Sequence, residues 1–215
     1  MSQTLTYLYD PLCGWCYGAM PALSALFAVG DVKIELMPTG LFADQGARPM
    51  DDDFAAFAWA NDQRIEGMTG QPFTEAYRQS VLADRQQRFD SGPATLALTA
   101  VVATTSAQEY TALKAIQHAR YVQGRDVTSP RVLADLLHSL GLTEAATLVR
   151  QPSDDIAAVN QARITRAQSL MREFGARGVP TLVLESGRTR SLLVANTVFS
   201  DPHDLINQVA AAAAS

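Results

Sequence analysis

The sequence predicts an α/β protein in which a long helical segment interrupts an α/β unit. Short, uncharged, apolar runs typical of buried strands occur near both ends of the chain, at Leu5–Tyr9 and Thr181–Leu184. From Asp51 to about Gly178, apolar residues instead recur every three or four positions, which indicates helices. The length of 215 residues suits one domain, or one domain with a sizeable insertion.

Composition favours a folded globule and argues against two classes of partner. Hydrophobic residues make up 47% of the chain and charged residues 18%. The 17 Lys and Arg residues against 22 Asp and Glu residues give a net charge of −5, with no basic cluster. We therefore expect neither nucleic acid nor an anionic membrane surface as a main partner.

The start of the sequence bears on location. Met1-Ser2-Gln3-Thr4 has neither the basic nor the apolar stretch of a signal peptide, and the strand that follows is too short to span a membrane. We expect a cytoplasmic protein, although the mature form of an exported protein would show the same pattern.

The first strand leads into a turn and a helix. Asp10-Pro11 ends the strand, because proline favours an extended conformation in the residue before it. A turn or capping role is expected for Asp10, and the alternative is a proton acceptor for nearby thiols. The helix is expected to run to about Ala28, with a kink or an early break near Pro21.

Cys13-Gly14-Trp15-Cys16, at the start of this helix, contains the only two cysteines of the chain. Two intervening residues let the sulfurs meet across one helical turn, so the pair can close a disulfide or open to a dithiol. The unpaired N–H groups and positive dipole end of a helix favour a negative sulfur. We predict that Cys13, the more exposed sulfur, is the nucleophile and that Cys16 resolves the mixed disulfide.

Two other uses of the cysteines are less well supported. A structural disulfide across so short a loop adds little stability to a chain with ample core of its own. A closed zinc site needs about four ligands. There is no second cysteine pair, and the histidines, His118, His138 and His203, show no ligand spacing. Redox chemistry without a metal is therefore the prediction, since a lone cysteine pair in the cytoplasm is seldom structural.

The next segment contains a second strand and a loop. A turn at Gly30-Asp31 precedes the alternating strand Val32–Met37, which ends at Pro38. The stretch Thr39–Pro49 reads as a loop because it holds two glycines and a proline. Its Leu41 and Phe42 are expected in the core rather than in a surface groove.

The helical segment is divided by capping residues, prolines and glycines. We predict helices that begin at Asp51–Asp53, Thr74, Ala94, Glu109, Ser129-Pro130, Thr143 and Asp154 or Asp155. The acidic run at the first of these suits a positive helix end and does not require a metal.

The end of the chain returns to strands and a helix. Thr181–Leu184 and Ser191–Val194, separated by a turn at residues 186–188, are expected to form a hairpin. Asp201 is the predicted cap of the last helix.

This order of elements resembles the DsbA family of thioredoxin-fold proteins from Leu5 to Val209. The most specific matches are Tyr9-Asp10-Pro11-Leu12-Cys13-Gly14-Trp15-Cys16 and Gly178-Val179-Pro180-Thr181. The first looks like the branch of predicted protein-disulfide isomerases related to FrnE-like proteins and 2-hydroxychromene-2-carboxylate isomerases. The resemblance implies a thioredoxin-fold domain at residues 1–50 and 160–215, with a large all-helical insertion at 51–159 packed over the active site.

The resemblance also implies roles around the cysteines. Pro180 matches the family's cis-proline, whereas the sequence alone favours a trans bond because about 5–6% of X–Pro bonds are cis. Val179 would then pair its backbone with a substrate beside Cys13. Trp15 is expected to expose a ring edge to the substrate, with a core position as the alternative. Gly14-Trp15 differs from the Pro-His of DsbA and the Gly-Pro of thioredoxin, so the redox direction is not carried over.

The predicted function is a thiol–disulfide oxidoreductase or protein-disulfide isomerase acting on protein or small-molecule thiols and disulfides. It requires no metal or organic cofactor, with glutathione as a candidate co-substrate. One alternative is a glutathione-linked transferase or small-molecule isomerase, with glutathione docked by Val179 and the loop after Met37. Such relatives often carry serine where Cys13 stands. The second alternative is a redox-sensing or chaperone-like binding protein. No histidine sits in a protease-like setting, and no phosphate-binding glycine loop occurs.

Overall fold

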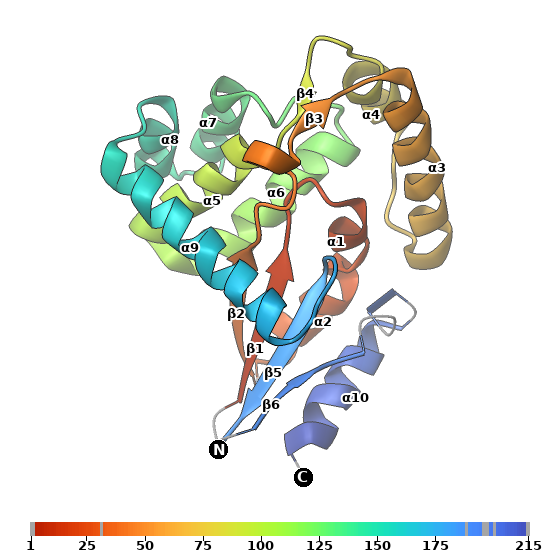
Figure 1. Cartoon of the computed structure of the whole chain (residues 1–215), viewed down its shortest axis with the longest axis vertical. Helices are drawn as coiled ribbons and strands as arrows, with labels where there is room; N and C mark the ends of the chain where they lie inside the picture. The colour runs from red at the N-terminus through yellow and green to blue at the C-terminus, as the bar shows by residue number, and fades with distance from the viewer. Residues whose placement is uncertain (1–2, 31, 188, 195–197, 200, 214–215) are drawn as a thin grey trace.

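A mixed four-stranded sheet carries the N-terminal and C-terminal parts of the chain (Figure 1). The computed structural model describes residues 3–213 except 31, 188, 195–197 and 200. The strand order is β2-β1-β5-β6. Strand β1 pairs parallel to β2 and antiparallel to β5, and β6 pairs antiparallel to β5. The strands are β1 Gln3–Tyr9, β2 Lys33–Pro38, β5 Thr181–Ser186 and β6 Thr189–Leu192.

Both faces of β1 are buried, which explains its uninterrupted apolar sequence. Leu5, Tyr7 and Tyr9 belong to the main core cluster. Leu8 points to the other face, because side chains alternate along a strand. There it joins a smaller cluster that includes Ala167 of the long helix α9, Asp154–Glu173.

Two helices follow β1 in place of the single one predicted. The first, α1, spans Gly14–Gly18, and α2 spans Met20–Val29. The break at Ala19 places Pro21 in the first turn of α2, where its missing N–H costs no helical hydrogen bond. The expected early break near Pro21 is thus confirmed. Gly30 ends α2 with φ 75°, in the left-handed region that glycine adopts readily.

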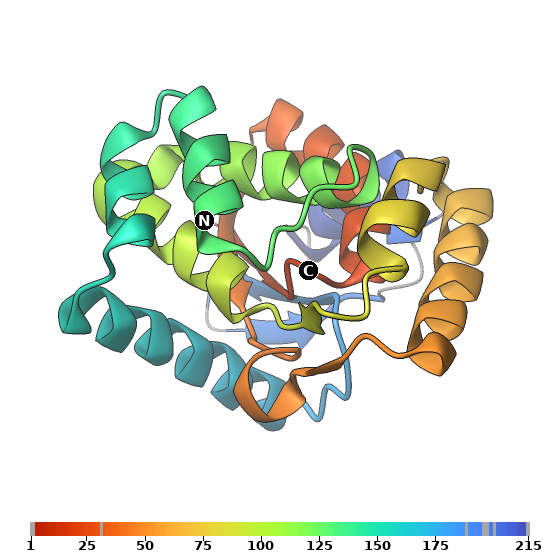
Figure 2. The ribbon, with the colours of Figure 1, turned by 90° about the horizontal axis from the view of Figure 1, so that it is seen from above.

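The middle of the chain is helical, as predicted. Its long helices are α3 Asp52–Thr69, α5 Gly92–Thr105, α6 Glu109–Tyr121, α7 Pro130–Ser139, α8 Thr143–Arg150 and α9. The short α4, Glu75–Tyr77, continues into a π-helical turn at Arg78–Leu82, and 3-10 turns occur at Asp44–Gly46 and Ser106–Gln108. Two short strands, β3 Arg48–Pro49 and β4 Arg88–Phe89, pair antiparallel in a separate two-stranded sheet. Figure 2 shows α3 on one side of the molecule and α7 to α9 on the other.

The capping predictions can be checked individually. Asp51 caps α3 by accepting from the backbone N–H of Phe54 at 2.8 Å. Asp201 directly precedes the last helix, α10 Pro202–Ala213, and its side chain accepts from the backbone N–H of His203 in the first turn. Helix α10 packs against α2. Helix α9 begins at Asp154, one of the two predicted starting residues, and Ser153 caps it by accepting from the backbone N–H of Ile156. Among the described residues, none of the helices combines the length and hydropathy needed to cross a membrane.

Several expectations were wrong in detail. Leu41 is 40% exposed rather than in the core. Its neighbour Phe42 turns inward, and its ring packs on that of Phe89. The backbone N–H of Phe42 donates to the Asp10 carboxylate. Helix α5 begins at Gly92, two residues before the predicted start at Ala94. Strand β6 ends at Leu192, before the predicted Val194. Asp31 and Arg188, expected in turns, lie outside the described residues.

The division into residues 1–50 and 160–215 around an insertion at 51–159 stays a prediction. Its second boundary falls inside α9, which is one continuous helix. Helix α9 contacts α5 of the helical segment and β2 of the sheet. It therefore ties the two parts of the chain together.

Candidate active site

Cys13 caps the short helix α1. The backbone of β1 leads through the Asp10–Leu12 turn to this residue, and the Cys13 Sγ accepts a hydrogen bond from the backbone N–H of Cys16 at 3.4 Å. Such a donor stabilises a negative sulfur. Cys13 is 6% exposed and Cys16 is 0% exposed, so Cys13 is the more accessible of the two, as expected. Both cysteines are free thiols.

Cys16 lies behind Cys13 in an apolar setting. Burial, followed by the hydrogen bond and the charge of Cys13, raises the pKa of the Cys16 thiol. The Tyr7 hydroxyl donates to the Cys16 carbonyl at 3.1 Å, and burial also raises the pKa of Tyr7. Cys16 is therefore held as a neutral thiol in the resting protein.

The segment before β5 faces the cysteine pair. The Val179–Pro180 peptide bond is cis. The Cys13 thiol donates to the Val179 carbonyl, with Sγ and O 3.6 Å apart. Thr181 closes the turn by donating its hydroxyl proton to the Gly178 carbonyl at 2.7 Å. The structure thus brings the two predicted motifs together across 166 residues of sequence.

Trp15 is half-buried at the edge of the site. Its ring meets Phe199 edge-on, with centroids 5.0 Å apart. The Arg64 guanidinium lies 5.7 Å from the Trp15 ring centroid, within the range of a cation–π contact. Sequence reasoning did not find Phe199 or Arg64, because nothing local in the sequence links either residue to the cysteines.

The buried Asp10 side chain accepts hydrogen bonds from three segments of the chain: the cysteine loop, the loop after β2 and the start of α5. Its carboxylate accepts from the backbone N–H of Leu12 at 2.9 Å, from that of Phe42 at 3.1 Å, and from the Ser91 hydroxyl at 2.7 Å. Burial raises the pKa of Asp10, and these hydrogen bonds oppose the increase. This is the turn-forming role that the sequence favoured, and it also anchors the start of α5 to the cysteine loop.

Two glycines of α1 lie in close contact with helix α3. A Cβ on Gly14 would lie 2.5 Å from the Asp62 Oδ1, and a Cβ on Gly18 would lie 2.6 Å from the Ile65 Cγ2. Both glycines are required by this close approach. The sequence held one signal of it, because residues four apart share a helix face and two glycines there admit a neighbouring helix.

Aromatic rings fill the space below the cysteine loop. The Tyr121 hydroxyl donates to the Leu12 carbonyl at 2.7 Å, and its ring stacks on Tyr17 at a centroid distance of 4.8 Å. Phe73 and Tyr77 meet the Tyr121 ring edge-on. Burial raises the pKa of Tyr17 to about 12, so its phenol stays neutral. These rings set the position of the residue that precedes Cys13.

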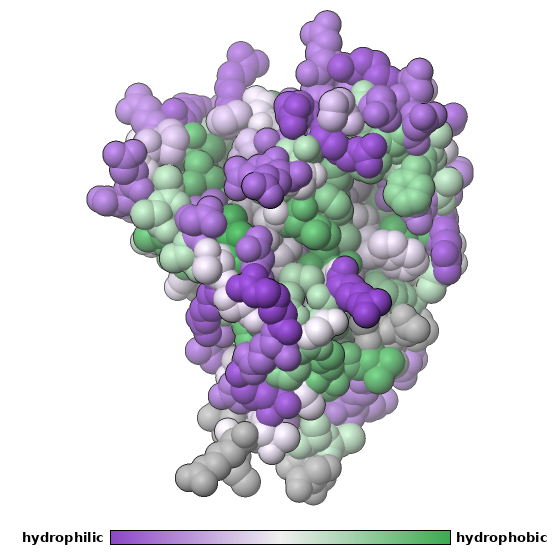
Figure 3. Space-filling view, viewed as in Figure 1, coloured by the Kyte–Doolittle hydropathy of each residue, from purple (hydrophilic) through white to green (hydrophobic). Residues whose placement is uncertain are grey.

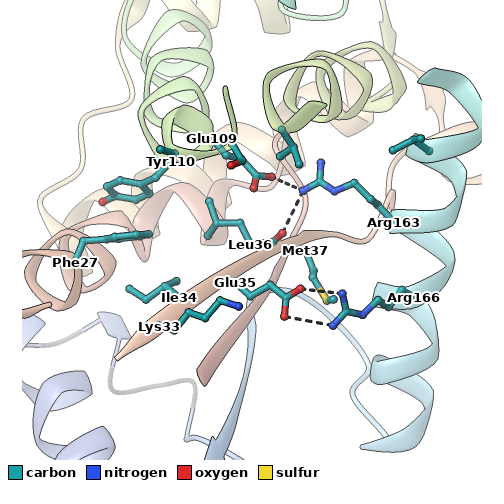
Figure 4. Close-up of a pocket in the computed structure, with 14 residues that line it drawn as sticks. Phe27, Lys33, Ile34, Glu35, Leu36, Met37, Glu109, Tyr110, Arg163 and Arg166 are labelled. Carbon is teal, nitrogen blue, oxygen red and sulfur yellow. Dashed lines mark hydrogen bonds and ion pairs between the residues drawn. The ribbon is translucent and has the colours of Figure 1, made fainter. Parts of the chain in front are cut away.

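A cavity of about 570 Å³ lies along β2, one of the two edge strands of the sheet (Figure 4). None of the predicted site residues lines it. Arg163 crosses it, donating to the Leu36 carbonyl at 3.2 Å and pairing with Glu109, while Arg166 pairs with Glu35. Among the described residues, no three His, Cys, Asp or Glu side chains form a group that could hold a metal ion.

Comparison with known proteins assigns the family. The model of the DSBA-like thioredoxin domain matches residues 4–207. The chain belongs to this family. Its helical middle and mixed sheet therefore form a thioredoxin fold with a helical insertion. A search of curated proteins finds no match.

Solved structures extend the comparison. The cytosolic disulfide reductase DsbM from Pseudomonas aeruginosa is 34% identical over 97% of this chain and 98% of its own, with a TM-score of 0.86. A structure of that protein with GSH gives 32% identity, 99% and 100% coverage, and a TM-score of 0.83. A protein from Nitrosomonas europaea described as a "putative protein disulfide isomerase" is 26% identical over 99% of this chain and 97% of its own, with a TM-score of 0.80.

Proposed function

We propose that this protein is a cytoplasmic thiol–disulfide oxidoreductase that reduces disulfides through Cys13 and Cys16. One observation carries the proposal: the Cys13 Sγ caps α1 and faces the Val179 carbonyl, with the buried Cys16 directly behind it. The direction and the location are supported by the 34% identity to a cytosolic disulfide reductase.

The reaction follows from the different settings of the two sulfurs. The Cys13 thiolate attacks one sulfur of a substrate disulfide, forms a mixed disulfide and releases the other substrate sulfur as a thiolate, which takes up a proton. Cys16 then loses its proton, attacks the Cys13 sulfur and releases the second substrate thiolate. The substrate gains two electrons and two protons, and the enzyme is left with a Cys13–Cys16 disulfide. Two molecules of an external thiol, with glutathione as the candidate, restore the dithiol and are themselves oxidised to a disulfide.

Val179, Pro180 and Trp15 are the proposed substrate contacts. The Val179 carbonyl already meets the Cys13 thiol, so an extended substrate on this backbone would present its sulfur to Cys13. Figure 3 shows patches of apolar surface near the middle of the face viewed in Figure 1, with hydrophilic surface above them and to their left. Such a surface suits the apolar parts of a protein substrate. The relative whose structure contains GSH supports a thiol of low molecular mass as the second partner. This chemistry uses thiols alone, without metal or organic cofactor.

Single replacements of the cysteines test the proposal. Cys13→Ser is expected to abolish reduction of a glutathione mixed disulfide and of insulin, because no other thiol is accessible at the site. Cys16→Ser is expected to accumulate an adduct on Cys13, detectable by intact mass, because the resolving sulfur is gone. Full turnover by the Cys13→Ser protein would refute the proposal.

A glutathione-linked transferase or isomerase is the second candidate, favoured by the relative with GSH. The intact cysteine pair argues against it. Calorimetry with glutathione separates the two: binding that survives replacement of both cysteines, without dithiol turnover in the wild type, would favour the transferase. A redox-sensing or chaperone-like binding protein would instead suppress aggregation of an unfolded client while failing to reduce insulin.

A further inference from the structure

Strand β2 has one edge that no other strand of the described sheet covers. It is the last strand in the order β2-β1-β5-β6 and pairs with β1 alone. The residue after the strand, Thr39, donates its backbone N–H to the Tyr9 carbonyl of β1 at 2.7 Å. Along a strand the N–H and C=O of one residue point to the same side, and successive residues point to opposite sides. The odd-numbered residues of β2 therefore bond to β1, and Ile34 and Leu36 turn their backbone groups away from it.

A contact from outside the sheet agrees with this outward direction. The Leu36 carbonyl accepts from Arg163 Nη2 of α9 at 3.2 Å. Within the described residues, the Leu36 N–H and both backbone groups of Ile34 have no hydrogen-bond partner. Unpaired backbone groups at a sheet edge are a template on which another extended segment can add.

The cavity along β2 gives such a segment room. Its volume of about 570 Å³ is within the range of sites that hold ligands. Helix α9 borders the cavity on one face of the strand, and α2 and α6 border it on the other (Figure 4). Arg163 of α9 and Glu109 of α6 pair with each other and join the two sides at one end of the cavity. An edge recessed between helices in this way admits a single extended segment more readily than the edge of a second sheet.

The side of the cavity toward α2 and α6 is apolar. Ile34 and Leu36 point their side chains to this side, where they meet the main core. The rings of Phe27 and Tyr110 line the cavity here and stack with centroids 3.9 Å apart. This wall suits the apolar side chains of an added segment.

The side toward α9 carries an excess of positive charge. Lys33 and Glu35 of β2 and Arg166 of α9 line it. Arg166 pairs with Glu35, and within the described residues no carboxylate lies within ion-pair distance of the Lys33 amine. Two cations against one anion favour an acidic side chain at this position.

We propose that the open edge of β2 binds a short extended segment of a partner protein by strand addition. The segment forms backbone hydrogen bonds with Ile34 and with the Leu36 N–H. Side chains of an added strand alternate between the two faces as those of β2 do. Its apolar residues therefore face Phe27 and Tyr110, and an acidic residue lies beside Lys33. None of the predicted redox-site residues lines the cavity, so this docking site goes beyond the proposed function.

The first experiment uses the wild-type protein and a pentapeptide of sequence Val-Glu-Val-Glu-Val with both ends blocked. Nitrogen-15 NMR at about 1 mM peptide is expected to show shifted amide signals at Ile34 and Leu36, and hydrogen exchange at Ile34 should slow about tenfold. A Val-Lys-Val-Lys-Val peptide should bind about fivefold more weakly, because the cations of the α9 side repel it. Unshifted signals from the cavity residues would overturn the proposal.

Methylated peptides separate strand addition from binding through side chains alone. One peptide carries N-methyl groups on its valines and another carries them on its glutamates. Only one of these two sets of N–H groups can face β2 in an added strand, so one peptide should lose affinity about tenfold and the other should keep it. Equal affinities of the two methylated peptides would overturn the proposal.

Substitutions in the protein test the same contacts. Lys33→Glu should reverse the preference between the acidic and the basic peptide, whereas Arg131→Glu, the same change of charge at an exposed position of α7, should leave it unaltered. Ile34→Pro removes an outward N–H without removing a bond to β1 and should abolish binding. An unchanged preference in Lys33→Glu, or full binding by Ile34→Pro, would overturn the proposal. If Ile34→Pro does not fold, the methylated peptides decide with the wild type.

Two further measurements fix the occupant and the independence of the site. Sedimentation that shows a wild-type dimer and an Ile34→Pro monomer would assign the edge to a second copy of the chain and overturn the proposal. Cys13→Ser should bind the acidic peptide as the wild type does, because the cysteines do not line the cavity. Loss of disulfide reduction and loss of peptide binding are thus separate results, and each ends only its own proposal.

Discussion

At the scale of single residues, the buried carboxyl groups decide how stability depends on pH. Asp10, Asp62 and Glu109 all have their pKa raised by burial, so each binds its proton more tightly in the folded state than in the unfolded chain. A raised carboxyl pKa means that folding stability falls as pH rises through the interval between the unfolded and folded values. The protein should consequently tolerate mildly acidic conditions well.

Asp62→Asn tests this dependence. For Asp62 the interval runs from 3.8 to about 7, and the slope contributed by one group is at most about 1.4 kcal/mol per pH unit. The variant is expected to lose stability relative to the wild type at low pH and to approach or exceed it above pH 7. Urea unfolding at a series of pH values measures the difference. A stability difference that does not vary with pH would contradict the prediction.

Some residues of the site can be identified from a short sequence motif, whereas others are brought to it only by the fold. Cys13 and Cys16 could be predicted because a Cys-x-x-Cys after a strand has a known chemical meaning. Val179 and Pro180 were reached through a family resemblance. The contact of Asp62 with Gly14 could not be predicted, because the two residues lie on different helices that only the folded chain brings together. Leu41 could not be placed correctly for a different reason. An apolar residue in a loop can face the core or the solvent, and the sequence does not show the hydrogen bond from the Phe42 backbone to Asp10 that fixes the loop here.

At the scale of elements, the packing of α1 against α3 positions the redox motif. Gly18→Ala is expected to destabilise the protein by about 1–3 kcal/mol, because the new Cβ would lie 2.6 Å from a methyl group of the buried Ile65. The gain in helix propensity, about 1 kcal/mol, does not offset an overpacked contact with a β-branched side chain.

Gly67→Ala is the matched control for this prediction. Gly67 lies in the interior of α3, and no atom lies within 4 Å of the position that a Cβ would occupy there, so alanine should stabilise by about 0.5–1 kcal/mol. Thermal unfolding of both variants separates the two effects. A stabilised Gly18→Ala protein would show that α3 does not restrict α1.

At the scale of the whole molecule, the order of elements could be predicted because each has its own periodicity, cap or breaker. The exact division between sheet and insertion could not. A long amphipathic helix has one continuous pattern, and nothing in the pattern of α9 says that one end packs on α5 and the other on the sheet. The connection between the two parts is instead made by side chains along α9.

Arg163 is the clearest of these connections. From α9 it pairs with Glu109 of α6, donates to the Thr99 hydroxyl of α5 at 3.0 Å, and donates to the Leu36 carbonyl of β2. The side chains of Arg163 and Glu109 are only 17% and 12% exposed. Arg166, three residues along the same helix, pairs with Glu35 but is 64% exposed.

The two arginines therefore make a matched pair for substitution. Arg163→Met is expected to cost about 3–5 kcal/mol, because it leaves the Glu109 carboxylate buried without its counter-charge. Arg166→Met should cost at most about 1 kcal/mol, as for an exposed ion pair. Burial already raises the pKa of Glu109 and Arg163 opposes the increase, so removing Arg163 raises it further. The cost of Arg163→Met should consequently shrink as pH falls and Glu109 becomes neutral, while that of Arg166→Met stays small throughout. Urea unfolding of both variants at neutral and acidic pH decides this, and equal costs for the two would show that the buried pair does not join the helical segment to the sheet.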